Sequence, residues 1–144
     1  MCWEAADTLP CEATAPEQAR RFVVRALSRA AAADGPVPVQ WRTLTEDAEL
    51  VVSELTTNAL RAACRELQVS IELHRAELVV SVRDDAGGWP HPRYAAPTDP
   101  SGRGLQLVGA MSERWGVTPA DGGKSVWAAL AVPTECEEIV SCER

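Results

Sequence analysis

Three short segments of the sequence carry residues whose types and spacing could do chemistry. In the first, Glu54 and Asn58 are four residues apart, which puts them one turn apart on the same face of a predicted helix. The carboxylate could orient or deprotonate a hydroxyl nucleophile, and the amide oxygen could ligate a hard cation such as Mg²⁺. A solvated helix face would give the same pattern, so this pair alone does not establish a site.

The second segment places Asp84 at the end of a predicted strand, directly before the sequence DAGG. An aspartate at such a point can accept a hydrogen bond from an exocyclic amine. Gly87 and Gly88 would let the backbone approach a flat ligand closely. The same residues are also typical of an ordinary turn after a strand, and this alternative stays open.

The third segment, SGRGL at residues 101–105, opens a predicted helix. Backbone N–H groups at a helix N-terminus and the helix dipole both favour anions, so this segment could hold phosphates. A plain joint between a loop and a helix would look the same.

The elements that must position these segments follow from the hydrophobic periodicity. Segment 89–102 contains four prolines and no period, which predicts a loop. One further strand is expected either near Val37–Trp41 or near Val117. The periodicity predicts helices over about 14–34, 43–66 and 105–115, the last ended by Gly116, and strands over about 69–74, 78–82 and 126–132.

This order of elements predicts a two-layer α/β sandwich, in which helices cover one face of a mixed, mostly antiparallel sheet. Residues 14–132 would form one domain, residues 1–13 an irregular lead-in, and residues 133–144 an acidic C-terminal tail.

Composition limits the classes of function. The chain has 144 residues with 46% hydrophobic and 24% charged residues, as in one soluble globular domain. The net charge of -7 argues against direct binding of nucleic acid. No apolar run is long enough for a membrane helix, and the N-terminus lacks the pattern of a secretory signal, so we expect a cytoplasmic protein without a membrane partner.

The cysteines predict neither a zinc site nor a disulfide framework, because their number is odd and none stands in a CxxC pair. Cys64 is expected in the core, Cys2 and Cys11 in the lead-in, and Cys136 and Cys142 in the tail.

Five blocks of the sequence, in this order, resemble the GHKL or Bergerat ATPase fold of DNA gyrase, a heat-shock chaperone, MutL and sensor histidine kinases. The resemblance covers roughly Pro16–Val132 and is greatest to the single-domain anti-sigma-factor serine/threonine kinases and their actinobacterial relatives. It is carried by ARRFVVRAL, DAELVVSELTTNALRAA, LVVSVRDDAGGWP, GRGLQLVGAMSERWGV and GGKSVWAAL.

The resemblance implies a role for each candidate residue. Glu54 matches the glutamate that polarises the attacking hydroxyl, and Asn58 the ligand of Mg²⁺ on the phosphates. Asp84 matches the residue that recognises the adenine amino group. Gly88 matches the later glycine of the sequence box that begins with Asp84. Ser125 matches a position whose hydroxyl would complete the adenine pocket. The residues that match those under the triphosphate of ATP are Gly102, Arg103, Gly104 and Leu105.

Three positions depart from the family pattern or are ambiguous within it. Ala86 replaces the first glycine of the DxGxG box. The arginine expected before the phosphate glycines is absent, which leaves Arg103 or Arg93 as substitutes. Lys124, the only lysine of the chain, could approach a phosphate.

By this resemblance we expect an ATP- and Mg²⁺-dependent protein serine/threonine kinase of the anti-sigma-factor type. It would phosphorylate a small antagonist protein and control transcription by switching between that protein and a sigma factor, and it could form a homodimer. The alternative is a non-catalytic nucleotide-binding module that sequesters a regulatory partner.

Overall fold

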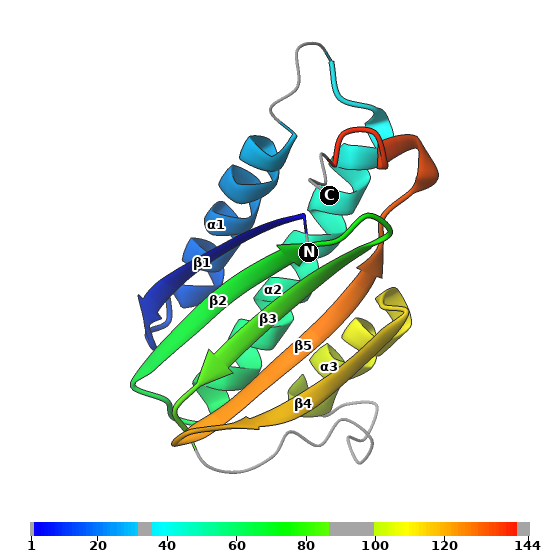
Figure 1. Ribbon diagram of the computed structural model, residues 1–144. Helices are drawn as coiled ribbons and strands as arrows, with labels where there is room; N and C mark the ends of the chain where they lie inside the picture. Colours follow the sequence, from blue (N-terminus) through cyan, green and yellow to red (C-terminus); the bar gives the residue numbers. More distant parts are fainter. Residues whose placement is uncertain (1, 32–35, 87–99, 141–144) are drawn as a thin grey trace.

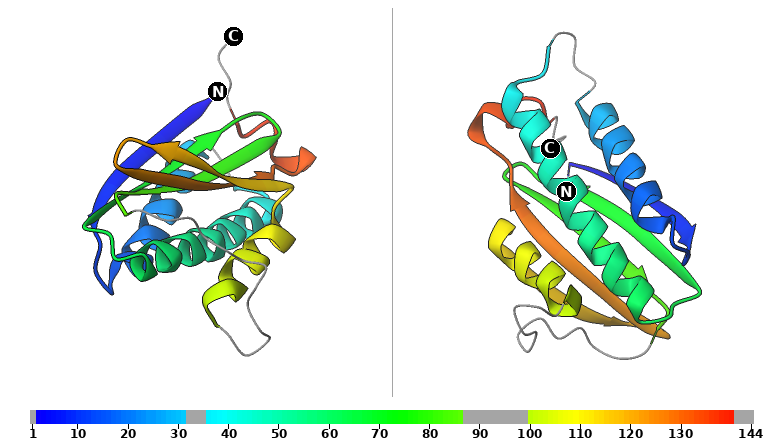
Figure 2. Two further views of the ribbon diagram at one scale, coloured as in Figure 1. Left: turned by 90° about the horizontal axis from the view of Figure 1, so that it is seen from below. Right: turned by 180° about the vertical axis from the view of Figure 1, so that it is seen from behind.

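The structure, a computed structural model, describes residues 2–31, 36–86 and 100–140, without the side chains of residues 100–103. Three helices lie on one face of a sheet (Figures 1 and 2). The helices are α1 (Ala15–Ala30), α2 (Val39–Arg61) and α3 (Pro100–Met111), followed near the C-terminus by the short 3-10 helix η1 (Thr134–Cys136). The strands are β1 (Trp3–Pro10), β2 (Glu66–Leu73), β3 (Glu77–Asp84), β4 (Arg114–Ala120) and β5 (Gly123–Ala131).

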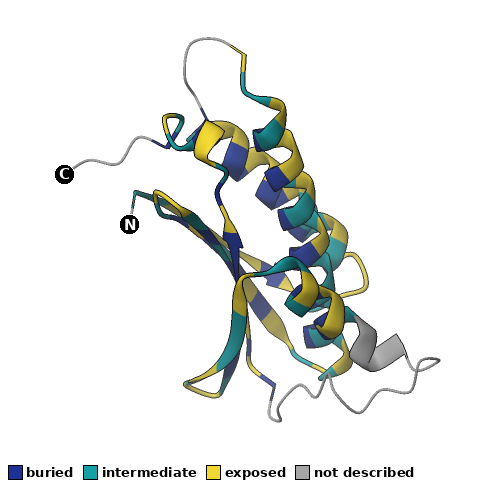
Figure 3. Ribbon diagram, turned by 90° about the vertical axis from the view of Figure 1, so that its right-hand side faces the viewer, coloured by how far each residue is buried: buried dark blue, intermediate teal, exposed yellow. Residues whose placement is uncertain are grey.

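The sheet has the strand order β1-β2-β3-β5-β4, and every one of these neighbouring pairs is antiparallel. The predicted fold class, a two-layer α/β sandwich with helices on one face, is confirmed. Successive side chains of a strand point to opposite faces, so the alternating apolar residues of β2, β3 and β5 all face the helices. Figure 3 shows the resulting core, with buried positions where the two layers meet.

The prediction of an irregular lead-in over residues 1–13 is wrong, because residues 3–10 form β1 and pair with β2 along its whole length. β1 is an edge strand with a single buried residue, Leu9. Its sequence therefore shows little of the alternation that identifies a half-buried strand.

Two of the predicted boundaries also need correction. α2 begins at Val39, which excludes a strand near Val37–Trp41, whereas the alternative strand near Val117 exists as β4. α3 spans Pro100–Met111, so Gly116 lies inside β4 and does not end a helix. At this position a Cβ atom would come within 2.7 Å of the Trp127 ring.

The predicted acidic tail is also partly wrong, since the segment that follows β5 packs against the core. Cys136 and Val140 are buried, and η1 contacts α2. The two apolar side chains anchor this segment although its exposed positions are acidic.

Ala63, directly after α2, adopts the left-handed backbone conformation, with φ of 59°. A Cβ atom makes this conformation costly, and glycine is the usual residue at such a helix end. We therefore expect Ala63→Gly to raise the free energy of unfolding by about 0.5–1 kcal/mol in urea denaturation. Ala62→Gly is the matched control: the neighbouring φ is -82°, so the same substitution should destabilise the protein.

Among the described residues, no helix combines the length and the apolar composition that a membrane span requires.

Candidate functional site

Four chain segments meet at one end of the molecule, at the bottom of Figure 1. They are the end of β3, the start of β5, the last turns of α2 and the first turn of α3. All three segments that the sequence singles out for chemistry therefore have residues at this end. Residues 87–99, including Gly88 and Arg93, lie outside the described part of the chain.

Glu54 of α2 lies against the start of α3. A Cβ atom built on Gly104 would collide with the Oε2 atom of Glu54, so only glycine allows this approach. Asn58 lies one turn further along α2 and is half-buried, as Glu54 is. The structure thus places Glu54, on the polar face of α2, against the glycine segment.

The first turn of α3 carries the backbone of Gly102 and Arg103, and Leu105 anchors the helix because its side chain is buried in the core. The first N–H groups of an α-helix have no partner within the helix. This turn therefore offers N–H donors next to the Glu54 carboxylate. The role of the Arg103 side chain stays a prediction.

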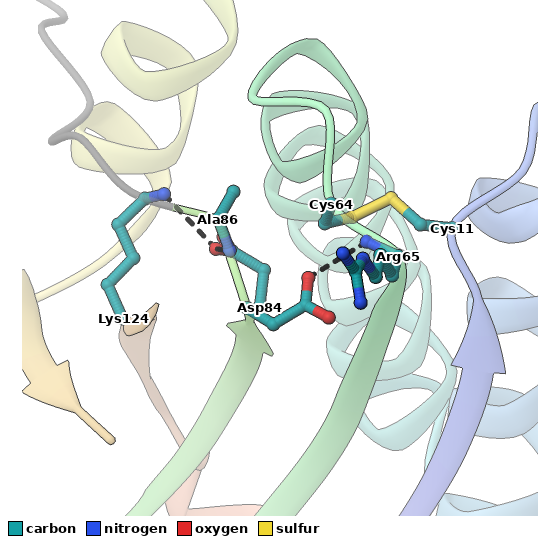
Figure 4. A network of polar contacts seen from close by, with 7 residues as sticks. Cys11, Cys64, Arg65, Asp84, Ala86 and Lys124 are labelled. Atoms are coloured by element: carbon teal, nitrogen blue, oxygen red, sulfur yellow. Dashed lines mark hydrogen bonds and ion pairs between the residues drawn. A yellow bond between two sulfur atoms is a disulfide. The ribbon is translucent and has the colours of Figure 1, made fainter. Parts of the chain in front are cut away.

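Asp84 is 3% exposed and accepts two hydrogen bonds on its Oδ1 atom (Figure 4). One comes from the backbone N–H of Ala86 at 2.9 Å and one from Nζ of Lys124 at 3.2 Å. Ala86 keeps a negative φ, since Ala63 is the only described non-glycine residue with a positive one. An alanine therefore fits where the family pattern has glycine.

Lys124 is 3% exposed and belongs to the Asp84 pair. The sequence suggested that this lysine approaches a phosphate, but the structure shows it bonded to the carboxylate at the end of β3. Gly123 makes the pairing possible, because a Cβ atom there would overlap the carbonyl oxygen of Asp84. β5 can therefore lie unusually close to the end of β3.

Ser125 does not complete the Asp84 pocket as predicted. In the register of the sheet Lys124 is opposite Asp84, and Ser125 is opposite Arg83. Since successive residues of a strand face opposite sides, Ser125 lies on the face without helices. An error of one residue in a strand assignment moves a side chain to the wrong face, and Lys124 holds the inward position.

A second network supports the end of β3 from the side of β2. The backbone N–H of Arg65 donates to Oδ1 of Asp85 at 2.8 Å, and the carbonyl of Arg65 accepts from the N–H of Cys11 at 3.0 Å. Cys11 and Cys64 form a disulfide (Figure 4), contrary to the prediction from the cysteine count. Sequence spacing could not reveal this pair because the two cysteines are 53 residues apart.

The hydrogen bond from the Arg65 backbone lowers the pKa of Asp85 below its usual 3.8. A carboxyl group whose folded-state pKa is lowered stabilises the fold above its unfolded-state pKa, and this contribution is lost as the pH falls through the folded-state pKa. We expect the stability difference between the wild type and Asp85→Asn to be constant from pH 5 to 7 and to shrink below about pH 4. Urea denaturation across this range measures it, with Asp121→Asn in the exposed β4–β5 turn as control.

A polar hollow lies beside Asp84 on the side of β1 and β2. Carboxylates outnumber guanidinium groups around it, so its charge disfavours phosphate. An anionic ligand group would be accommodated better at the α3 end. The hollow is lined by Thr8, Glu66, Leu67, Gln68, Arg83, Asp84, Asp85 and Asp121.

No three His, Cys, Asp or Glu side chains come together as a metal cluster within the described residues. Asn58 offers one protein oxygen at this end, and phosphate oxygens of a bound ligand could supply further ligands to a divalent cation. This donor set is the one that Mg²⁺ uses when it is held by one or two protein groups and by substrate phosphates.

Together, the sandwich, the buried carboxylate at the end of β3 and the α3 N-terminus beside Glu54 define a nucleotide-binding class of domain. Residues 12–130 match the family model of the histidine kinase-like ATPase domain. Since the match spans most of the chain, the protein belongs to this family, and its predicted place in the GHKL superfamily is confirmed. Domains of this superfamily bind ATP, usually with Mg²⁺.

Among solved structures, the chain is similar to the histidine kinase domain of the blue-light activated histidine kinase from Erythrobacter litoralis EL346, with 23% sequence identity and a TM-score of 0.50. The match covers 88% of this chain and 66% of that one, just under two thirds of its length. At this identity the similarity supports the shared fold alone. No curated protein matches the sequence.

Proposed function

We propose that this protein binds ATP with Mg²⁺ and acts as a protein serine/threonine kinase of the anti-sigma-factor type. The observation that carries the proposal is the contact of Glu54 with Gly104, which puts a carboxylate beside the N–H donors of α3. A hydroxyl at this point would have both a proton acceptor and an anion-binding turn within reach.

Each residue has a role that its position allows. Asp84 accepts a hydrogen bond from the base, the first turn of α3 binds phosphate oxygens, and the Asn58 amide oxygen ligates Mg²⁺. Glu54 orients the hydroxyl of a serine or threonine and accepts its proton. The γ-phosphoryl group of bound Mg²⁺-ATP would pass to this hydroxyl as its bond to the bridging oxygen of ADP breaks, with ADP as the leaving group; this transfer depends mainly on positioning and on stabilisation of charge.

The proposed partners are a small antagonist protein, which would be phosphorylated, and a sigma factor. If both partners use one surface and the nucleotide state favours one of them, a change of nucleotide shifts the equilibrium between the two complexes. The family match and the absence of a net positive charge support a protein partner over direct contact with nucleic acid. A homodimer remains part of this proposal.

Nucleotide binding is tested by thermal unfolding with and without Mg²⁺-ATP. A ligand present at 100 times its Kd should stabilise the native protein by about 2.7 kcal/mol. The shift caused by ATP should be lost in Asp84→Asn and kept in Ser125→Ala, whose side chain lies on the other face of the sheet. An equal shift in Asp84→Asn would contradict the assigned base site.

Phosphotransfer is tested with labelled ATP and candidate antagonist proteins. We expect Gly104→Ala to fold, because the added Cβ meets only the end of the flexible Glu54 side chain. The displaced carboxylate should lower the transfer rate by about 100-fold. Gly109→Ala is the matched control, since its Cβ would meet Trp115 and not Glu54.

Transfer that survives in Glu54→Ala would contradict the role of this carboxylate. Binding of ATP without transfer to any candidate would instead support the alternative, a non-catalytic module that sequesters its partner.

A further inference from the structure

The buried cation beside Asp84 is not explained by the function proposed so far. The side chains of Lys124 and Asp84 are 4% and 1% exposed, and Nζ lies 3.2 Å from Oδ1. Both project toward the helix layer, because they are register partners on β5 and β3. A site for adenine needs an acceptor for the amino group, yet here a positively charged side chain lies directly beside that acceptor.

The ammonium group has capacity for a further hydrogen-bond partner. It carries three N–H donors, and among the described residues its only hydrogen-bond partner is Asp84. A buried ammonium group is stabilised by each acceptor that reaches it, so a ligand acceptor next to Asp84 would be bound favourably here. A hydrophobic or hydroxyl side chain at position 124 would offer no such charge.

We propose that Lys124 is a second base-reading residue, and that the Asp84–Lys124 pair accepts guanine nucleotides as well as adenine nucleotides. This inference rests on the proposed binding of nucleotide at Asp84. It adds a specificity-determining residue and extends the ligand class from ATP to purine nucleoside triphosphates.

Hydrogen-bond complementarity gives the reason. Asp84 alone offers only acceptors, which suits the N6 amino group of adenine but repels the O6 oxygen of guanine. With Lys124 the site presents an acceptor next to a donor. Adenine can donate from N6 to Asp84 and accept at N1 from Lys124. Guanine can donate from N1 and N2 to Asp84 while its O6 accepts from Lys124.

The structure also explains why Lys124 should contact the base and not a phosphate. Its ammonium group is held at Asp84, at the end of β3, while Glu54 contacts Gly104, near the start of α3. The lysine follows Gly123, whose close contact with the carbonyl of Asp84 fixes the start of β5. Lys124 is therefore placed by the same strand pairing that places the proposed adenine-binding residue.

Isothermal titration calorimetry of the full chain with Mg²⁺-ATP, Mg²⁺-GTP and Mg²⁺-ITP tests the inference. For the wild type we expect Kd values for ATP and GTP within about tenfold of each other. In Lys124→Met the affinities for GTP and ITP, which share the O6 oxygen, should fall by about 10- to 100-fold relative to ATP. Lys124→Arg keeps a cationic donor and should keep the wild-type ratio more closely.

The ratio of the wild-type Kd values for ATP and GTP tests the inference even if Lys124→Met fails to fold. A preference of the wild type for ATP over GTP of more than about 100-fold would overturn the inference and leave the proposed binding of ATP intact. An ATP/GTP ratio that is unchanged in folded Lys124→Met would also overturn it. If no nucleotide binds the wild type, the proposed function fails as well.

Discussion

Replacing Cys11 and Cys64 together by serine should lower the free energy of unfolding by about 4 kcal/mol. The disulfide closes a loop of 53 residues, and the chain-entropy relation gives about this value for a loop of that length. The cross-link joins the chain between β1 and α1 to the chain between α2 and β2. Its loss therefore gives the unfolded chain more conformational freedom, which lowers the free energy of unfolding.

Denaturant unfolding under non-oxidising and non-reducing conditions measures this effect. Either single substitution breaks the same bond, so Cys11→Ser, Cys64→Ser and the double variant should lose similar amounts of stability. Cys2 is also disulfide-bonded, so the double variant should keep some sensitivity to a dithiol reductant. A double variant within 1 kcal/mol of the wild type would contradict a stabilising cross-link.

The disulfide also bears on the predicted cytoplasmic location. Stable disulfides are rare in reducing compartments. The thiol state of Cys11 and Cys64 in cells, measured by alkylation, would test that prediction, which the fold itself leaves open.

The interior of the fold was predictable because burial imposes a period on the sequence. The apolar stripes of α1 and α2 and the alternation in β2, β3 and β5 are all visible from sequence. β1 was missed because an edge strand is specified mainly by backbone pairing with β2, which leaves a weak pattern of side chains.

The positions of candidate site residues were predictable where they depend on local spacing. Glu54 and Asn58 share a face of α2 because they are four residues apart, whereas the contact of Glu54 with Gly104 is visible only in the structure. Contacts across the sheet were not predictable in this way. The choice between Lys124 and Ser125 depends on the register of β5 against β3, which a shift of one residue inverts.

Cysteine counting failed for a related reason. The odd number of cysteines correctly excludes complete pairing, and Cys136 is indeed free and buried. It does not exclude cross-links between distant segments, and Cys2 is disulfide-bonded as well as Cys11 and Cys64. Cys11 and Cys64 come together because β1 pairs with β2, so the pair follows from the strand that the sequence did not reveal.

Lys124→Met should destabilise the protein by about 3–5 kcal/mol, because it leaves the Asp84 carboxylate buried without its counter-charge. Methionine fills much of the lysine volume, so the loss is mainly electrostatic. Ser125→Ala, one residue further along β5 and on the other face of the sheet, should change stability by less than about 1 kcal/mol. Urea denaturation of the three proteins measures both effects.

A double variant that combines Asp84→Asn with Lys124→Met separates the loss of the ion pair from the loss of packing. Asp84→Asn removes the carboxylate charge but keeps an Oδ1 acceptor for the Ala86 N–H, which is 2.9 Å away in the wild type. In the wild type this substitution breaks the ion pair and should be destabilising. In the Lys124→Met background it removes the unpaired charge and should be stabilising. For a buried ion pair, the change in the free energy of unfolding caused by Asp84→Asn should therefore have opposite signs in the wild type and in Lys124→Met. Additive effects of the two substitutions would show that Asp84 and Lys124 do not interact energetically.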